Sequence, residues 1–140
     1  MNRAERRRQE AARAERPTAT VEAWLDRGRR HQQAGRLREA EAAYRQALDL
    51  LPQHAETLHL LGLVTYRQQR LPESLNFLQA ALDREGSSPT YWFNFGVVSQ
   101  KAGRAVEAAR AYERAVELNP RYAEAYGNWG NVLRETGNLT

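Results

Sequence analysis

Apolar and polar residues alternate along this chain with the three-and-four spacing of amphipathic helices. From Val21 onward the pattern returns every 34 residues, most clearly in a series of glycines that runs from Gly28 to Gly130. With Val21 as position 1 of a 34-residue repeat, positions 4, 8 and 11 share one face of a first helix, and positions 20, 24 and 27 share one face of a second. The pattern predicts seven helices, over residues 20–34, 37–51, 55–68, 72–84, 89–102, 105–118 and 123–136.

Each repeat is therefore expected to form a helical hairpin with closely packed helices. Position 8 is always glycine and positions 20 and 27 are always small, so the helix axes can approach while large residues at positions 4 and 24 fill the space. Gly35 and Gly103 mark the end of a first helix, and Gln69 takes that place in the middle repeat. The predicted repeats are 21–54, 55–88 and 89–122, followed by the first helix of a fourth in 123–140.

These residues resemble the tetratricopeptide repeat, a 34-residue helix–turn–helix with large, Leu-Gly, Ala, aromatic, Ala and Pro residues at set offsets. Arg27 departs from the family pattern, which prefers leucine there. The resemblance implies an all-α fold, a right-handed superhelical solenoid of antiparallel helix hairpins with about three and a half repeats. The segment Ala-Glu-Ala-Tyr-Gly-Asn-Trp-Gly-Asn-Val-Leu-Arg is most similar to the repeats of bacterial O-GlcNAc-transferase-like (SPINDLY-like) proteins.

Charge changes this picture only at the N-terminus. The chain of 140 residues has a formal net charge of +4, and its first 16 residues hold six arginines against three glutamates. That segment has no large apolar residue beyond Met1, so it has no face to bury against a core. We predict a solvated basic tail over residues 1–19, disordered or a fraying helix. The interleaved glutamates weigh against binding of nucleic acid or an anionic membrane through this tail.

No set of catalytic or metal-ligating residues stands out in the sequence. Cysteine is absent, and His31, His54 and His59 share no helical face at the spacing of metal ligands. We therefore predict no catalysis, no metal and no cofactor within this chain. No apolar run is long enough to span a bilayer and no signal-peptide core follows Met1, so we expect a cytoplasmic protein.

The first helices carry the candidate binding surface. With positions 4, 8 and 11 buried, positions 2, 5, 9 and 12 lie on the neighbouring face. The family resemblance implies that this face lines a concave groove for extended peptides, and that Asn94 and Asn128, both at position 6, belong to an asparagine ladder that grips a peptide backbone. With positions 6 and 13 added, the candidate groove residues are Asp26, Arg29, Gln33, His59, Leu63, Tyr66, Arg67, Phe93, Asn94, Val97, Gln100, Lys101, Asn128, Asn131 and Arg134.

The sequence favours a scaffold that binds a protein or peptide partner and has no chemistry of its own. One alternative is the substrate-presenting arm of a bacterial O-GlcNAc-transferase-like glycosyltransferase whose catalytic domain lies beyond residue 140. Another gives the arginine-rich tail a nucleic-acid or membrane role. Tyr126, Trp129 and Leu133 occupy the face that a following helix would cover, so we also expect self-association through the last helix, or its loss, in the isolated chain.

Overall fold

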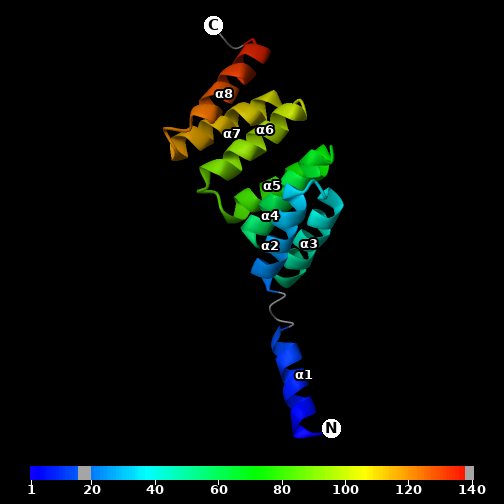
Figure 1. The fold of residues 1–140 in the computed structure, drawn as a ribbon. Coiled ribbons are helices and arrows are strands. Elements are labelled where there is room, and N and C mark those ends of the chain that lie inside the picture. The colour runs from blue at the N-terminus through cyan, green and yellow to red at the C-terminus, as the bar shows by residue number, and fades with distance from the viewer. Residues whose placement is uncertain (16–19, 138–140) are drawn as a thin grey trace. The chain divides into compact units, whose positions relative to one another are not determined.

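The computed structural model describes residues 1–15 and 20–137, and all regular structure in these ranges is α-helical (Figure 1). The predicted all-α class is therefore confirmed. The ends of the predicted tail and of the fourth repeat, residues 16–19 and 138–140, lie outside the described residues. The chain forms two compact units, Met1–Pro52 and Gln53–Thr140. The first unit contains α1 (Arg3–Glu15), α2 (Val21–Gln33) and α3 (Leu37–Leu50); the second contains α4 (Ala55–Arg67), α5 (Leu71–Arg84), α6 (Pro89–Lys101), α7 (Ala105–Leu118) and α8 (Ala123–Glu135).

Helices α2 to α8 begin and end within one residue of the predicted positions. Side-chain caps define two of the starts, because the hydroxyls of Thr20 and Ser88 each accept a hydrogen bond from the backbone N–H three residues later. Gly35 and Gly103, both at φ 77°, end α2 and α6 in the left-handed region that glycine adopts without strain. Gln69 takes the same conformation after α4, with φ 63°.

Helix α1 lies in the basic tail, for which the sequence left a fraying helix open, and it raises the described helices to eight from the predicted seven. Its start is fixed by a reciprocal pair of hydrogen bonds: the Glu5 N–H donates to Asn2 Oδ1 at 2.8 Å, and the Asn2 N–H donates to Glu5 Oε2 at 3.2 Å. The residues that follow are alanine, arginine, glutamine and glutamate, which have high helix propensity. The count of seven helices was wrong because it depended on a buried face, whereas α1 forms from capping and propensity.

The hairpins pack through the glycine of the first helix and the large residue of the second. In the first unit the Tyr44 ring lies over Gly28, and its hydroxyl donates to Gln32 Oε1 at 2.6 Å. In the second unit Tyr112 covers Gly96 in the same way, 68 residues further along the chain. Both tyrosines are fully buried. In the α4–α5 hairpin Leu78 lies over Gly62, so the glycine at position 8 meets the large residue at position 24 in each of the three complete hairpins.

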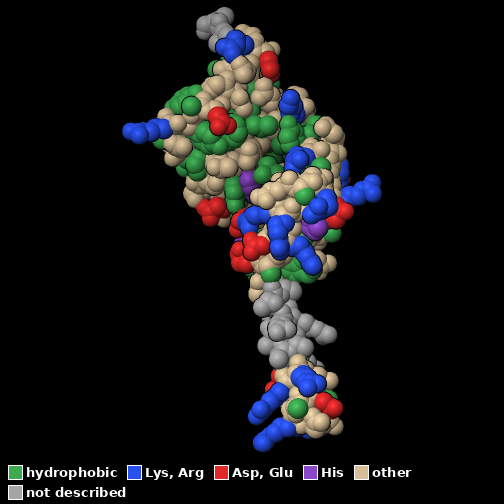
Figure 2. All heavy atoms as spheres, in the orientation of Figure 1, with side chains coloured by type: hydrophobic (Ala, Val, Ile, Leu, Met, Phe, Trp, Pro, Cys, Tyr) green, Lys and Arg blue, Asp and Glu red, His purple; other side chains and the backbone are tan. Residues whose placement is uncertain are grey.

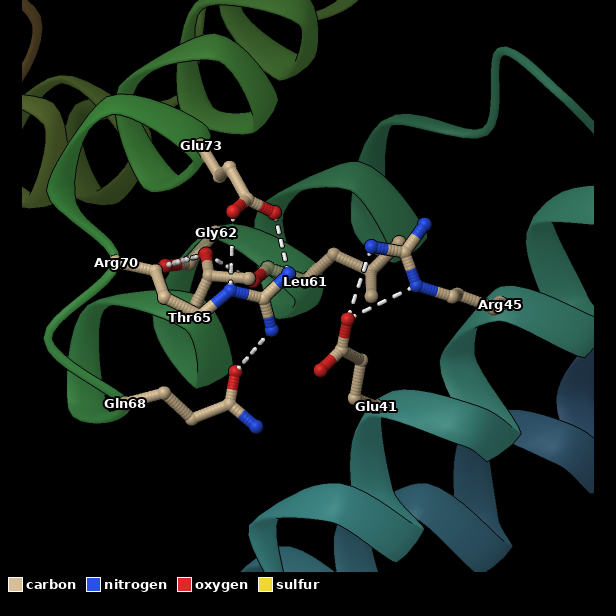
Figure 3. Close-up of polar contacts among 8 residues, drawn as sticks. All are labelled: Glu41, Arg45, Leu61, Gly62, Thr65, Gln68, Arg70 and Glu73. Carbon is tan, nitrogen blue, oxygen red and sulfur yellow. Dashed lines mark hydrogen bonds and ion pairs between the residues drawn. The ribbon is translucent and has the colours of Figure 1, made fainter.

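Polar contacts stabilise the turn between α4 and α5 (Figure 3). The Arg70 guanidinium donates to Gln68 Oε1 at 2.6 Å and to Glu73 Oε1 at 3.1 Å, and so joins the residues on either side of the turn. On α3, in the first unit, Arg45 Nε donates to Glu41 Oε2 at 2.9 Å across one helical turn. Such exposed i,i+4 pairs contribute only about 0.3–0.5 kcal/mol each, so packing dominates the stability of the hairpins.

Helix α8 buries one face and exposes the opposite one. Val132 packs with Tyr112 in a core cluster, and Ala125 packs in a neighbouring one. On the other side Tyr126 is 46% exposed, and beyond its own chain neighbours and the adjacent α8 backbone no heavy atom lies within 4 Å of the place that a Cβ would take at Gly130. Among the described residues no large side chain covers Gly130 as one covers the equivalent glycine in each complete repeat. Trp129, which was predicted on the uncovered face, packs against both core clusters, and self-association through this face stays a prediction.

Candidate functional site

All candidate residues lie on the first helices of the repeats, α2, α4, α6 and α8. In the first unit they are Asp26, Arg29 and Gln33 of α2. The Arg29 guanidinium donates to Asp26 Oδ1 at 3.3 Å, so these two charges partly neutralise each other. In the second unit α6 contacts both α4 and α8, which brings the candidate residues of three helices onto one surface.

A polar contact joins α6 to α4 at the centre of this surface. The Asn94 side-chain amide lies with Nδ2 3.0 Å from His59 Nε2, and the His59 ring stacks on Tyr91 with centroids 4.2 Å apart and planes 19° apart. His59 is only 7% exposed. Burial lowers its pKa from 6.5 to about 4, so the ring is neutral at pH 7 and its Nε2 can accept a hydrogen bond from the Asn94 amide N–H. One end of the Asn94 amide is thereby committed to α4.

A second polar contact joins α6 to α7 and α8. The Tyr112 hydroxyl donates to Gln100 Oε1 at 2.9 Å, and Gln100 Nε2 donates to the Glu135 carboxylate at 3.2 and 3.3 Å. Burial raises the pKa of Tyr112 to about 12, while a hydrogen bond with the Asn128 side chain opposes the rise. Gln100 and Asn128 are therefore both engaged in contacts between helices, as Asn94 is.

The remaining candidate residues divide into packing and exposed positions. Phe93 and Val97 are half-buried and pack against the core cluster that contains Tyr112 and Val132. Leu63 and Tyr66 of α4 are also half-buried. The exposed candidates of the second unit carry charge or an amide: Arg67, Lys101, Asn131 and Arg134. The surface thus offers cations from α4, α6 and α8, beside half-buried amides.

Sequence reasoning missed two residues that shape this surface, Tyr91 and Glu135, and it placed Tyr112 only as a packing residue at repeat position 24. The repeat pattern holds a signal for Tyr112, because glutamine at position 12 accompanies tyrosine at position 24 in the first and third repeats. The Gln32–Tyr44 pair and the Gln100–Tyr112 pair both form the corresponding hydrogen bond. The contacts of Tyr91 and Glu135 have no comparable signal, since their partners come from other repeats.

The first unit carries an open cavity of about 400 Å³ between α2 and α3. Trp24, Arg27 and His31 of α2 and Glu39 of α3 are among the residues that line it. The Arg27 guanidinium lies 5.3 Å from the centroid of the Trp24 ring, within cation–π distance. None of the candidate groove residues lines this cavity, which has the size of a small-ligand pocket and is lined by both polar and apolar side chains.

Comparison with known proteins places the chain in a family. Residues 25–91 match one model of the tetratricopeptide repeat, and residues 89–122 match a second. The chain belongs to the tetratricopeptide repeat family. A curated relative, the tetratricopeptide repeat-containing protein trd-1 of Caenorhabditis elegans, is 27% identical over 101 residues, which are 72% of this chain and 13% of that protein. The chain thus spans only a small part of that relative's length.

Two solved structures show the same fold. An O-GlcNAc transferase mutant of Thermobaculum terrenum has a TM-score of 0.77 and 27% identity over 84% of this chain and 23% of that one. YrrB, described as a TPR protein with an unusual peptide-binding site, has a TM-score of 0.81 and 23% identity over 92% of this chain and 66% of that one. Among the described residues, no helix has both the length and the apolar character needed to cross a membrane.

Proposed function

We propose that the second unit binds an extended segment of a protein partner along the exposed sides of α4, α6 and α8, without chemistry of its own. The fold supports the general role, since tetratricopeptide repeats serve as protein-interaction scaffolds. The observation that carries the proposal is the surface formed by three first helices, where exposed cations stand beside half-buried amides. Amides can pair with the backbone N–H and C=O groups of an extended peptide whatever its side chains.

The charges favour an acidic segment. Arg67, Lys101 and Arg134 are exposed on successive first helices, and Glu135, whose carboxylate accepts hydrogen bonds from the neutral Gln100 amide, offsets only one of these three charges. Positive charge on a binding surface raises the association rate of acidic partners and favours them over basic ones. The preferred ligand is therefore an extended peptide with several aspartates or glutamates.

Removing two of these cations tests the charge preference. We expect Arg67→Gln with Lys101→Gln to weaken binding of an acidic peptide, chosen from a peptide array, by about three- to tenfold and to reduce its salt dependence. Isothermal titration at two salt concentrations measures both effects. The matched control is Arg110→Gln with Arg114→Gln. It makes the same change in net charge on α7, which carries none of the candidate binding residues. An equal loss in the control would mean that only net charge matters.

The two asparagines test backbone recognition. If their amides grip the peptide, Asn94→Ala with Asn128→Ala should weaken binding by about 1–3 kcal/mol per folded molecule. The contacts with His59 and Tyr112 predict a loss of stability as well, because a buried polar group loses its partner. Thermal melts and peptide titrations of the same variant separate the effects. A lower melting temperature with unchanged affinity would leave these amides a structural role alone.

A second candidate function is the substrate-presenting arm of a glycosyltransferase. The observation in its favour is the likeness to the Thermobaculum terrenum O-GlcNAc transferase, which at 27% identity exceeds that of YrrB. Reading the gene beyond the codon for Thr140 is the direct test. A transferase domain encoded there, with sugar transfer to the same acidic peptides, supports this function; a stop codon or further repeats alone would exclude it.

A further inference from the structure

Helix α1 presents arginine side chains that the fold does not use. Every side chain from Met1 to Glu10 is exposed, so this part of the helix buries nothing. Arg3, Arg6 and Arg7 follow the i, i+3, i+4 spacing and therefore share one face, whereas Arg8 lies about 100° further around the helix from Arg7, beyond the edge of that face. The basic side chains project from α1 in Figure 2.

The glutamates of this segment offset the arginines less than their number indicates. The Glu5 carboxylate turns back to the helix start, where it accepts a hydrogen bond from the Asn2 N–H. At that place it is stabilised by the positive end of the helix dipole. Glu10 lies on the arginine face, four residues after Arg6 and three after Arg7, so it offsets part of the charge there and leaves three arginines against one glutamate. A helix therefore gathers the positive charge that an extended chain would spread.

We propose that α1 is a nucleic-acid-binding arm whose arginines at positions 3, 6, 7 and 8 contact the phosphate backbone. A guanidinium group matches a phosphate with two parallel N–H···O hydrogen bonds. Binding of this kind needs no pocket and no packed core, because most of its free energy comes from release of counterions. It depends on phosphates and not on base sequence.

Two other anionic partners fit α1 less well. A helix that lies on a membrane inserts an apolar face, and between Arg3 and Glu10 the only apolar residue is Ala4. Protein interfaces depend on buried aromatic or aliphatic anchors, which this segment also lacks. A phosphate backbone needs neither, so the charge on α1 is complementary to a nucleic acid.

The test measures binding of the full chain to a fluorescein-labelled RNA of mixed sequence, about 20 nucleotides long. Four phosphate contacts on a single strand predict that affinity falls about 50-fold between about 50 mM and 200 mM salt. Replacing all four arginines of α1 with glutamine, a good helix former, should lower affinity at the lower salt about tenfold or more. Circular dichroism checks that helix content is retained.

The matched control replaces four exposed arginines outside α1 with glutamine and so has the same net charge as the α1 variant. These arginines are Arg38, Arg84, Arg110 and Arg121. It should keep most of the affinity. The proposal is wrong if the wild-type chain does not bind RNA at low salt, or if the control variant loses as much affinity as the α1 variant. It is also wrong if vesicles containing phosphatidylserine, or polyglutamate of equal charge, compete as well as unlabelled RNA. The acidic-peptide titration of these same variants shows separately whether the proposed peptide surface is intact.

Discussion

Replacing Gly96 with valine will destabilise the second unit by about 2–4 kcal/mol. A Cβ at this position would lie 2.7 Å from Tyr112 Cε1 and 2.9 Å from Cδ1, closer than side chains pack. The tyrosine cannot easily move away, because it is fully buried and its hydroxyl donates to Gln100. Valine also has lower helix propensity than most residues. Urea unfolding followed by circular dichroism gives the change in the free energy of unfolding.

The chain supplies its own control at the same repeat position. At Gly130 no heavy atom beyond its chain neighbours and the adjacent α8 backbone lies within 4 Å of the place that a Cβ would occupy. Gly130→Ala should therefore leave stability unchanged or raise it by up to about 1 kcal/mol, through better helix propensity and a less flexible unfolded chain. Equal losses at Gly96 and Gly130 would show that close packing against the second helix is not what position 8 requires.

The repeat pattern predicted the hairpins because each hairpin repeats one local solution. A glycine in the first helix and a large residue 16 positions later meet wherever two antiparallel helices are joined by the same turn. The Gly28–Tyr44 and Gly96–Tyr112 contacts follow from that rule. Helix α1 could not be predicted in this way, since it buries no face and depends on the Asn2–Glu5 capping contacts.

The candidate surface was harder to predict than the fold. Its helices and register came from the sequence, but the state of each side chain depends on neighbours one repeat away. His59 stands at a position assigned to the open groove, yet Tyr91 stacks on it and Asn94 contacts it from the next repeat. Residues 32 to 35 positions apart leave no periodic signal for a particular contact, because each repeat carries a different side chain at the same position.

The stability of the second unit will fall as the pH drops from about 6.5 to 4, and His59 will account for about 3 kcal/mol of this loss. Burial lowers the pKa of His59 to about 4, against 6.5 for the exposed ring of the unfolded chain. Between these values the unfolded chain binds a proton that the folded chain does not, so unfolding is favoured. Above pH 6.5 both states are neutral and the full contribution is present.

Urea unfolding at pH 7.5, 5.5 and about 4 measures this loss against a variant without the ionisable ring. His59→Gln is the informative change, because an amide can still pair with Asn94 but takes up no proton in this range. Between pH 7.5 and 4, the unfolding free energy of the wild type should fall by about 3 kcal/mol more than that of His59→Gln. His31→Gln, which removes a histidine of the first unit, should not alter the contribution of His59. A wild-type pH dependence that survives in His59→Gln would show that carboxylates cause the acid sensitivity and that the contact between α4 and α6 does not depend on a neutral ring.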